Sequence, residues 1–89
     1  MKSRTTRGFR ELRNRLPAGI QESAERAYTL FRQNPHHPSL HFKKVHTAQE
    51  IYSVRVTKGY RALGLRQGET IVWFWIGSHA EYERLLRQL

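Results

Sequence analysis

The sequence contains no cysteine, so disulfide bonds, thiol catalysis and zinc sites with cysteine ligands are excluded. It also has no apolar run near the roughly 20 residues that a membrane-spanning helix needs. The basic N-terminal stretch lacks the apolar segment of a signal peptide. With 89 residues, of which 38% are hydrophobic, the chain has room for one core. We therefore expect a single domain over residues 1–89, in a reducing compartment such as the cytoplasm.

Acidic residues are scarce, since 7 aspartates and glutamates stand against 16 lysines and arginines, a net charge of +9. The excess lies in two blocks, residues 1–16 and residues 41–66. Each block holds six basic side chains and one acidic side chain, a net charge of +5. A fold of this size does not need such an excess for solubility. The charge predicts a polyanionic partner, which can be RNA, DNA, an acidic protein or an anionic membrane surface.

The N-terminal half has the apolar period of helices. Phe9, Leu12 and Leu16 predict a first helix over residues 6–15. A second helix is predicted from Pro17 to the break at Asn34-Pro35, and its apolar stripe consists of Ile20, Ala24, Ala27, Tyr28 and Phe31. We expect the two helices to form a hairpin with one apolar seam.

After Pro38 the pattern changes to the period of strands. Strands are predicted over residues 40–46, 51–57, 60–66 and 70–76, with the last apolar on both faces and therefore central. Short glycine-containing turns join the later strands, which predicts an antiparallel meander. Residues 79–88 predict a final helix with Ser78 as its N-cap. The expected fold is α+β: two N-terminal helices packed on a four-stranded antiparallel sheet, with a short C-terminal helix.

The hairpin between residues 51–57 and 60–66 decides whether Arg55 and Arg61 can act together. A two-residue loop of Lys58 and Gly59 would point the two arginines to opposite faces of the sheet. A three-residue loop that includes Thr57 would place them directly opposite each other on one face. That loop requires Gly59 in the left-handed conformation, which glycine favours, so we prefer it.

Two arginines side by side repel each other, which favours an anion bound between them. His79 and Tyr82, at the start of the last helix, are the nearest candidates for proton transfer. Together these four side chains could cleave RNA without a metal ion. A base would take the 2′-hydroxyl proton, the arginines would stabilise the phosphate, and an acid would protonate the 5′-oxygen. The alternatives are arginines paired with acidic residues at the sheet edge, namely Glu50 or Glu69, and a capping or solvent role for His79.

Further polar and aromatic residues surround this hairpin. Lys43, Lys44 and His46 lie on the first predicted strand, and Lys58 lies on the turn, so all four are candidates for RNA binding. The histidines at 36, 37 and 41 form no HExxH or fixed histidine–carboxylate pattern, so we expect no metal and no cofactor. Aromatic residues at 73–75 could stack on bases, but in so apolar a strand at least two of the three should be core.

The order and spacing of several segments are similar to those of a known group. The segments are Pro38-Ser39-Leu40, Phe42-Lys43-Lys44, Tyr52-Ser53-Val54-Arg55-Val56, Tyr60-Arg61-Ala62-Leu63 and Trp75-Ile76-Gly77-Ser78-His79-Ala80-Glu81-Tyr82. The chain resembles, over roughly residues 6–87, the RelE/ParE superfamily of bacterial type II toxins. The resemblance implies a small α+β toxin with a cognate antitoxin. RelE-like members cut mRNA, commonly on the ribosome and without metal, whereas ParE-like members inhibit DNA gyrase.

The resemblance also implies roles for individual residues. Arg61 matches the arginine of the "YR" strand, and Arg55 matches the arginine before the turn. His79 matches a histidine that ends the last strand in some RNA-cutting members, with Tyr82 as the nearby aromatic. The two lysines at 43 and 44 fall where cleaving members often bind substrate. The chain departs from the family in two places, because only residues 2–6 could supply its opening strand and the central hairpin has one extra residue.

Three functions remain open from the sequence. The first is a metal-independent endoribonuclease toxin that cuts mRNA, with Arg61, His79, Tyr82 and Arg55 as catalytic residues. The second is a non-catalytic toxin that blocks DNA gyrase, for which His79 would matter little. The third is a basic nucleic-acid-binding module without toxicity. The expected partners are an antitoxin and either mRNA with the ribosome or gyrase.

Overall fold

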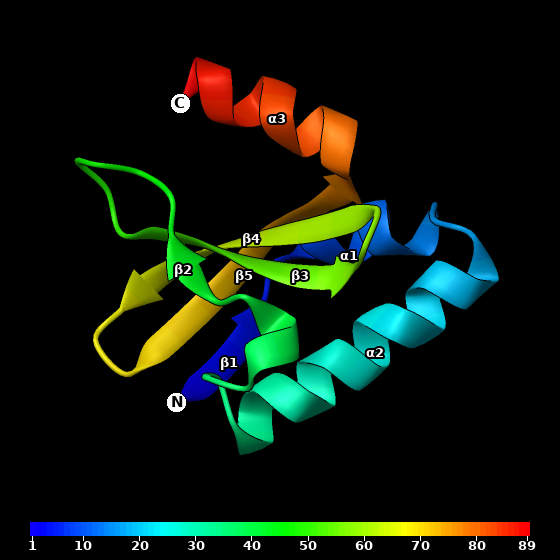
Figure 1. Ribbon diagram of the computed structural model, residues 1–89, viewed down its shortest axis with the longest axis horizontal. Coiled ribbons are helices and arrows are strands. Elements are labelled where there is room, and N and C mark those ends of the chain that lie inside the picture. The colour runs from blue at the N-terminus through cyan, green and yellow to red at the C-terminus, as the bar shows by residue number, and fades with distance from the viewer.

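A five-stranded sheet forms the centre of the computed structural model, which describes all residues from 1 to 89 (Figure 1). Along the chain the strands are β1 (Lys2–Thr5), β2 (Lys43–Lys44), β3 (Ile51–Thr57), β4 (Tyr60–Gln67) and β5 (Thr70–Ser78). The helices are α1 (Arg7–Asn14), α2 (Ala18–Gln33), the short 3₁₀ helix η1 (Pro38–Leu40) and α3 (His79–Gln88). The strand order across the sheet is β1-β5-β4-β3-β2. The predicted α+β class is therefore confirmed.

The strand β1 corrects the predicted four-stranded antiparallel sheet. It adds a fifth strand that runs parallel to β5, with Ser3 opposite Ile71. The Trp73 indole nitrogen donates to Ser3 Oγ at 2.9 Å, and the Tyr28 hydroxyl donates to the Ser3 carbonyl at 3.0 Å. Because β1 is held by polar contacts and carries no apolar side chain, the period of hydrophobic residues gave no sign of it.

The predicted strand over residues 40–46 is also corrected. Only Lys43 and Lys44 pair with β3, opposite Ser53 and Tyr52. Leu40 is instead the last residue of η1, and His41 then takes the left-handed conformation with φ of 48°. Pro38 suits the first turn of such a helix, so Leu40 belongs to η1 and not to the predicted strand.

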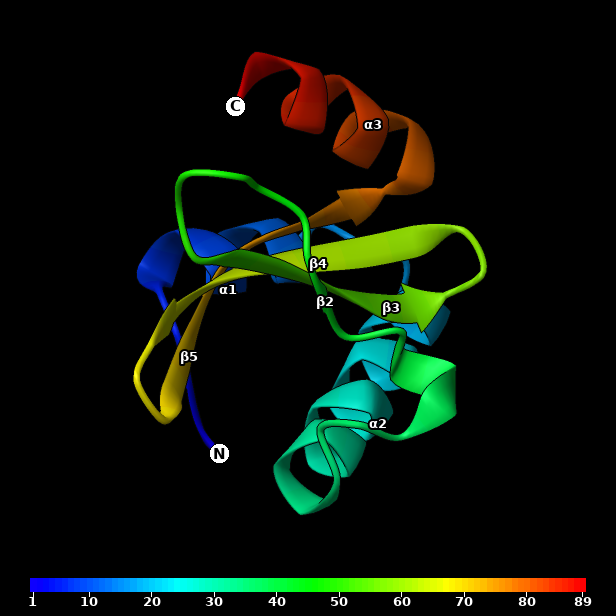
Figure 2. The ribbon, with the colours of Figure 1, turned by 60° about the vertical axis from the view of Figure 1, so that its left-hand side comes forward.

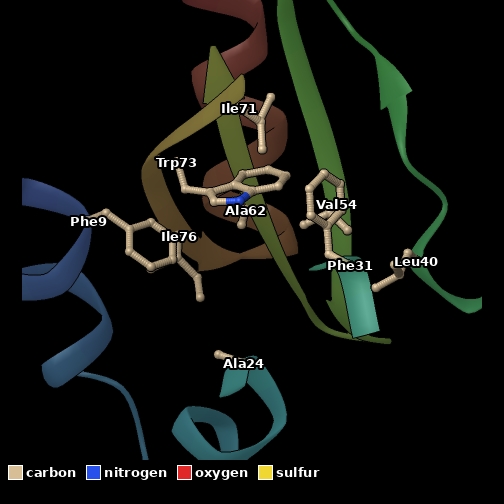
Figure 3. Close-up of a cluster of buried hydrophobic side chains, with 9 residues drawn as sticks. All are labelled: Phe9, Ala24, Phe31, Leu40, Val54, Ala62, Ile71, Trp73 and Ile76. Atoms are coloured by element: carbon tan, nitrogen blue, oxygen red, sulfur yellow. The ribbon is translucent and has the colours of Figure 1, made fainter. Parts of the chain in front are cut away.

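The two N-terminal helices share one core with the sheet. α1 packs mainly on β5, and α2 packs mainly on β3. Figure 3 shows Phe31 of α2 beside Val54 and Trp73 of the sheet, and its ring centroid is 5.2 Å from that of Trp73. The buried residues of this cluster are Phe9, Ala24, Phe31, Leu40, Val54, Ala62, Ile71, Trp73 and Ile76. We call the side of the sheet that carries this cluster the α1/α2 face.

The opposite side, which we call the α3 face, has a smaller core. Figure 2 shows α3 on one side of the sheet and α2 on the other. The buried residues under α3 are Ile51, Leu63 and Tyr82. As predicted, the aromatic residues of β5 serve packing, since Trp73 is in the first core and both Phe74 and Trp75 pack against the second. No helix is long and apolar enough to cross a membrane.

Candidate functional site

Arg55 and Arg61 lie directly opposite each other across the β3–β4 hairpin, as the sequence predicted. The cause of this pairing differs from the prediction. Thr57 already pairs with Tyr60, and the register shifts between Arg55 and Thr57, so Val56 is the extra residue of a β-bulge. The bulge sits in the strand and restores the pairing that a two-residue loop would otherwise have lost.

The prediction that Gly59 takes the left-handed conformation is therefore wrong. Gly68 is the only glycine with a positive φ, at 62°. The loop consists of Lys58 and Gly59, and the Gly59 amide donates to Thr57 Oγ1 at 3.2 Å. Sequence reasoning placed the extra residue in the turn because glycine is the usual marker of such a bulge, whereas Val56 carries no such signal.

The two arginines are held differently. Arg61 Nη1 donates to three backbone carbonyls of the turn, those of Thr57 (2.7 Å), Tyr60 (2.9 Å) and Lys58 (3.2 Å). The Arg55 side chain makes no hydrogen bond or ion pair within the protein. Neither arginine pairs with a carboxylate, which corrects the alternative in which Glu50 or Glu69 would neutralise them. Arg61 is therefore oriented in advance, and Arg55 is free to meet an anion.

His79 begins α3 at the end of β5, where its backbone amide donates to the Gly59 carbonyl at 2.8 Å. Its Nε2 lies 3.1 Å from Glu83 Oε1, one helical turn on. Its ring centroid is 5.8 Å from that of Tyr82. His79 does not cap the helix, because Ser78 and Glu81 form a capping box. The amide and hydroxyl of Ser78 hydrogen-bond Glu81 and lower the pKa of its carboxyl.

A cleft of about 390 Å³ lies between α3 and the sheet and brings most of the predicted site together. Two basic strand residues, Lys43 and Lys44, line it beside Arg55 and Arg61. Its lining residues are His41, Lys43, Lys44, Val45, Ser53, Arg55, Arg61, His79, Tyr82, Glu83 and Leu86. The charged lining consists of two arginines and two lysines against one carboxylate, with two histidines beside them, so the cleft suits a ligand with several negative charges.

Two predicted RNA-binding residues lie outside this cleft. Both ring nitrogens of His46 are occupied elsewhere: Nδ1 accepts from the Ala48 and Gln49 amides at 3.1 and 2.9 Å, and Nε2 bonds the Leu89 carbonyl at 2.9 Å. Because β2 ends at Lys44, His46 lies in the loop that follows, and its hydrogen bonds hold that loop together and join it to the end of α3. Lys58 is exposed at the tip of the hairpin and does not line the cleft.

Three polar cleft residues were not predicted as site residues from the sequence, namely His41, Ser53 and Glu83. The signals for two of them were present. Ser53 lies two residues before Arg55, so period 2 puts both on one face of β3. Glu83 lies four residues after His79, so the helical period puts them side by side. His41 depends on the turn after η1, which no sequence period indicated. No three histidine or acidic side chains come together in a way that could hold a metal ion.

The family model of the ParE-like toxin domain matches residues 18–84. The chain belongs to the ParE-like toxin domain family. This toxin domain also confirms the resemblance to the RelE/ParE superfamily. No curated protein sequence matches it closely enough to count as a relative.

Solved structures share the fold of this toxin domain at low sequence identity. A chain of the RelB-RelE antitoxin-toxin complex from Methanococcus jannaschii has a TM-score of 0.74 and 14% identity, with 92% of this chain and 96% of that chain covered. YafQ from E. coli has a TM-score of 0.69 and 10% identity, with 91% and 96% covered. The isolated RelE toxin from E. coli has a TM-score of 0.65 and 14% identity, with 99% and 98% covered.

Proposed function

We propose that this toxin domain is a metal-independent endoribonuclease that cuts mRNA, acting in the cytoplasm as the toxin of a type II toxin–antitoxin pair. The observation that supports the proposal is the single cleft that His79 and Tyr82 line together with the Arg55–Arg61 pair. A proton-transfer group beside two guanidinium groups is what cleavage of a phosphodiester needs when no metal ion assists.

The proposed reaction begins with the 2′-hydroxyl of the RNA. With its Nε2 proton donated to Glu83, neutral His79 has Nδ1 free to take the 2′-hydroxyl proton. The 2′-oxygen then forms a bond to phosphorus, and the bond from phosphorus to the 5′-oxygen breaks. Tyr82 donates a proton to the leaving 5′-oxygen. The products are a 2′,3′-cyclic phosphate and a free 5′-hydroxyl, and Arg55 and Arg61 stabilise the negative charge that builds up on the phosphate.

Charge supports both proposed partners. The net charge of +9 and the basic cleft would attract mRNA, including mRNA held on a ribosome. An acidic segment of an antitoxin would compete for the same cleft, which would keep the toxin inactive until the antitoxin is lost. A RelB-RelE complex among the proteins of the same fold is consistent with an antitoxin partner.

Inhibition of DNA gyrase is the second candidate function. The observation that favours it is the match to a ParE-like family model, since ParE-like members of the superfamily inhibit gyrase. In that case the basic cleft would bind protein and His79 would have no chemical role. Purified toxin would then reduce supercoiling by gyrase, and mRNA would stay intact.

Induced expression of the wild type and of His79→Ala, followed by mapping of mRNA 5′ ends, tests the proposed nuclease. We expect new 5′ ends within coding regions for the wild type and none for His79→Ala. His36→Ala is the matched control, because His36 is exposed and lies outside the cleft, and it should cut like the wild type. Growth arrest without new 5′ ends, together with inhibited supercoiling, would support the gyrase function instead.

A further inference from the structure

Ser53 is the one buried residue outside the aliphatic, aromatic and glycine residues, at 2% exposure. Its hydroxyl forms no hydrogen bond within the protein, although its neighbours in β2 and β4 pair with its backbone strand. No fully enclosed side-chain nitrogen or oxygen lacks a hydrogen-bond partner. The unbonded Ser53 hydroxyl is therefore not fully enclosed. Because Ser53 lines the cleft, this hydroxyl points into the floor of the cleft.

Two unpaired cations stand next to this hydroxyl. Lys43 lies directly opposite Ser53 in the β2–β3 register, where side chains begin about 5 Å apart. Arg55 follows Ser53 by two residues on the same face of β3, about 7 Å along the strand. Neither Lys43 nor Arg55 has a carboxylate partner, whereas the ammonium of Lys44 pairs with Glu50 at 3.5 Å. A hydroxyl donor between two free cations suits a phosphate group.

We propose that Ser53, Lys43 and Arg55 form a binding subsite for the RNA phosphate next to the one that is cleaved. The subsite rests on the proposed RNA cleavage, which places the scissile phosphate between Arg55 and Arg61. The Ser53 row lies one side-chain repeat of the strand away from that pair, about 7 Å, similar to the spacing of successive phosphates in an extended RNA strand. Arg55 stands between the two positions and contacts both phosphates.

The state of the Ser53 hydroxyl distinguishes this role from a structural one. A hydroxyl that supports the fold forms hydrogen bonds within the protein, and its removal destabilises the protein. The Ser53 hydroxyl forms none, so its removal leaves no partner unsatisfied and costs the fold nothing. Ser53→Ala should therefore melt at or above the temperature of the wild type while it binds RNA less tightly.

Equilibrium binding to a short oligoribonucleotide that contains a mapped cleavage site tests the subsite. A 2′-deoxy nucleotide at the cleaved bond prevents cleavage, so affinity is measured apart from chemistry. We expect Ser53→Ala to raise the Kd about 10-fold, the loss typical of one hydrogen bond to a charged group. Ser23→Ala on α2, which removes a hydroxyl outside the cleft, is the matched control and should bind like the wild type.

A second set of oligoribonucleotides replaces one phosphate at a time with an uncharged methylphosphonate. Neutralising a phosphate adjacent to the cleaved bond should weaken binding of the wild type, and the same change should have little further effect on Ser53→Ala or Lys43→Ala. Equal Kd values for Ser53→Ala and the wild type would overturn the subsite. It would also be overturned if the neutral phosphate weakened binding of Ser53→Ala and Lys43→Ala as much as it weakens binding of the wild type. If the wild type binds no RNA, the proposed nuclease fails with it. If the wild type binds and cuts RNA normally while Ser53→Ala binds equally well, the subsite alone fails.

Discussion

The two faces of the sheet are built from the same strands and differ in how completely they are covered. On the α1/α2 face nine buried residues form the core, and Phe31 packs edge-on against both Phe42 and Trp73, with centroid distances of 4.9 and 5.2 Å. On the α3 face the core has only three buried hydrophobic residues with partly buried ones around them, and polar side chains line the cleft beside it. Alternate residues of β3 supply both, since Val54 faces the large core and Arg55 the cleft. One face should therefore govern stability and the other activity.

The largest effect should come from His79→Ala on the α3 face. Loss of the proton-transfer group should lower the rate of RNA cleavage by about 10²–10⁴-fold. Stability should change little, because the His79 and Glu83 side chains are 48% and 51% exposed and exposed polar contacts of this kind contribute about 0–1 kcal/mol. Cleavage rates on a defined RNA, measured beside urea unfolding of the same preparation, check both parts. Undiminished cleavage would remove His79 from the proposed site.

Phe31→Ala on the α1/α2 face should have the opposite effect, a loss of stability without a loss of activity. Phe31 is 1% exposed, and removing such a ring from a packed core costs about 3–5 kcal/mol of the free energy of unfolding. Urea denaturation measures this loss, and Gln33→Ala at an exposed position of α2 is the control. The fraction of protein that remains folded should cut RNA at the normal rate. A large fall in the activity of folded protein would show that the two faces are not independent.

Gly77→Ala should sharpen the comparison, because it tests whether the α3 face has a tightly packed part of its own. A Cβ at Gly77 would lie 2.6 Å from the Trp75 ring and 3.1 Å from Glu81 Oε1. Such overpacking costs about 1–3 kcal/mol, measured by thermal or urea unfolding. Gly19→Ala is the control, since open space surrounds that position and alanine favours the helix. If Gly77→Ala is as stable as Gly19→Ala, the expectation fails, because the Trp75 ring must then move aside at no cost.

The smallest effect should come from the capping box of α3. Ser78→Ala should cost about 1 kcal/mol, as the loss of an N-cap hydroxyl does. Hydrogen bonds from Ser78 lower the pKa of Glu81 in the folded protein below its ordinary value of 4.5. Their contribution is therefore present above pH 4.5 and is lost as the pH falls through the lowered pKa. Melting temperatures of the wild type and Glu81→Gln should differ at neutral pH and converge in acid.

Most of the fold could be predicted from the sequence, because most elements bury a regular apolar stripe. The helices α1 and α2 and the strands from β3 to β5 lie within one or two residues of their predicted bounds. The strand β1 was left out of the predicted sheet, although the family resemblance pointed to residues 2–6 as the one possible opening strand. Its contacts with Trp73 and Tyr28 are polar and come from distant parts of the chain, so no apolar pattern marks it. The strand β2 was predicted too long because a left-handed residue, His41, interrupts it.

The sequence predicted most residues of the candidate site, but it did not predict how their side chains are held. Arg55, Arg61, His79 and Tyr82 follow from the hairpin and from the helix start, and they do line one cleft. The position of His46 outside the cleft could not be predicted, because its hydrogen bonds depend on how the loop after β2 folds against the end of α3. The free hydroxyl of Ser53 likewise depends on what surrounds it in three dimensions, which no spacing in the sequence records.

The central claim is that the α3 face cuts RNA by attack of the 2′-hydroxyl, and the chemistry of the product ends tests it most directly. Purified wild-type protein should be incubated, in the presence of a metal chelator, with a defined RNA and with the same RNA carrying a single 2′-deoxy nucleotide at the mapped cleavage site. The account predicts fragments with 2′,3′-cyclic phosphate and 5′-hydroxyl ends from the first RNA, and no cleavage of the second at that site. Fragments with 5′-phosphate ends, or equal cleavage of both RNAs, would contradict it.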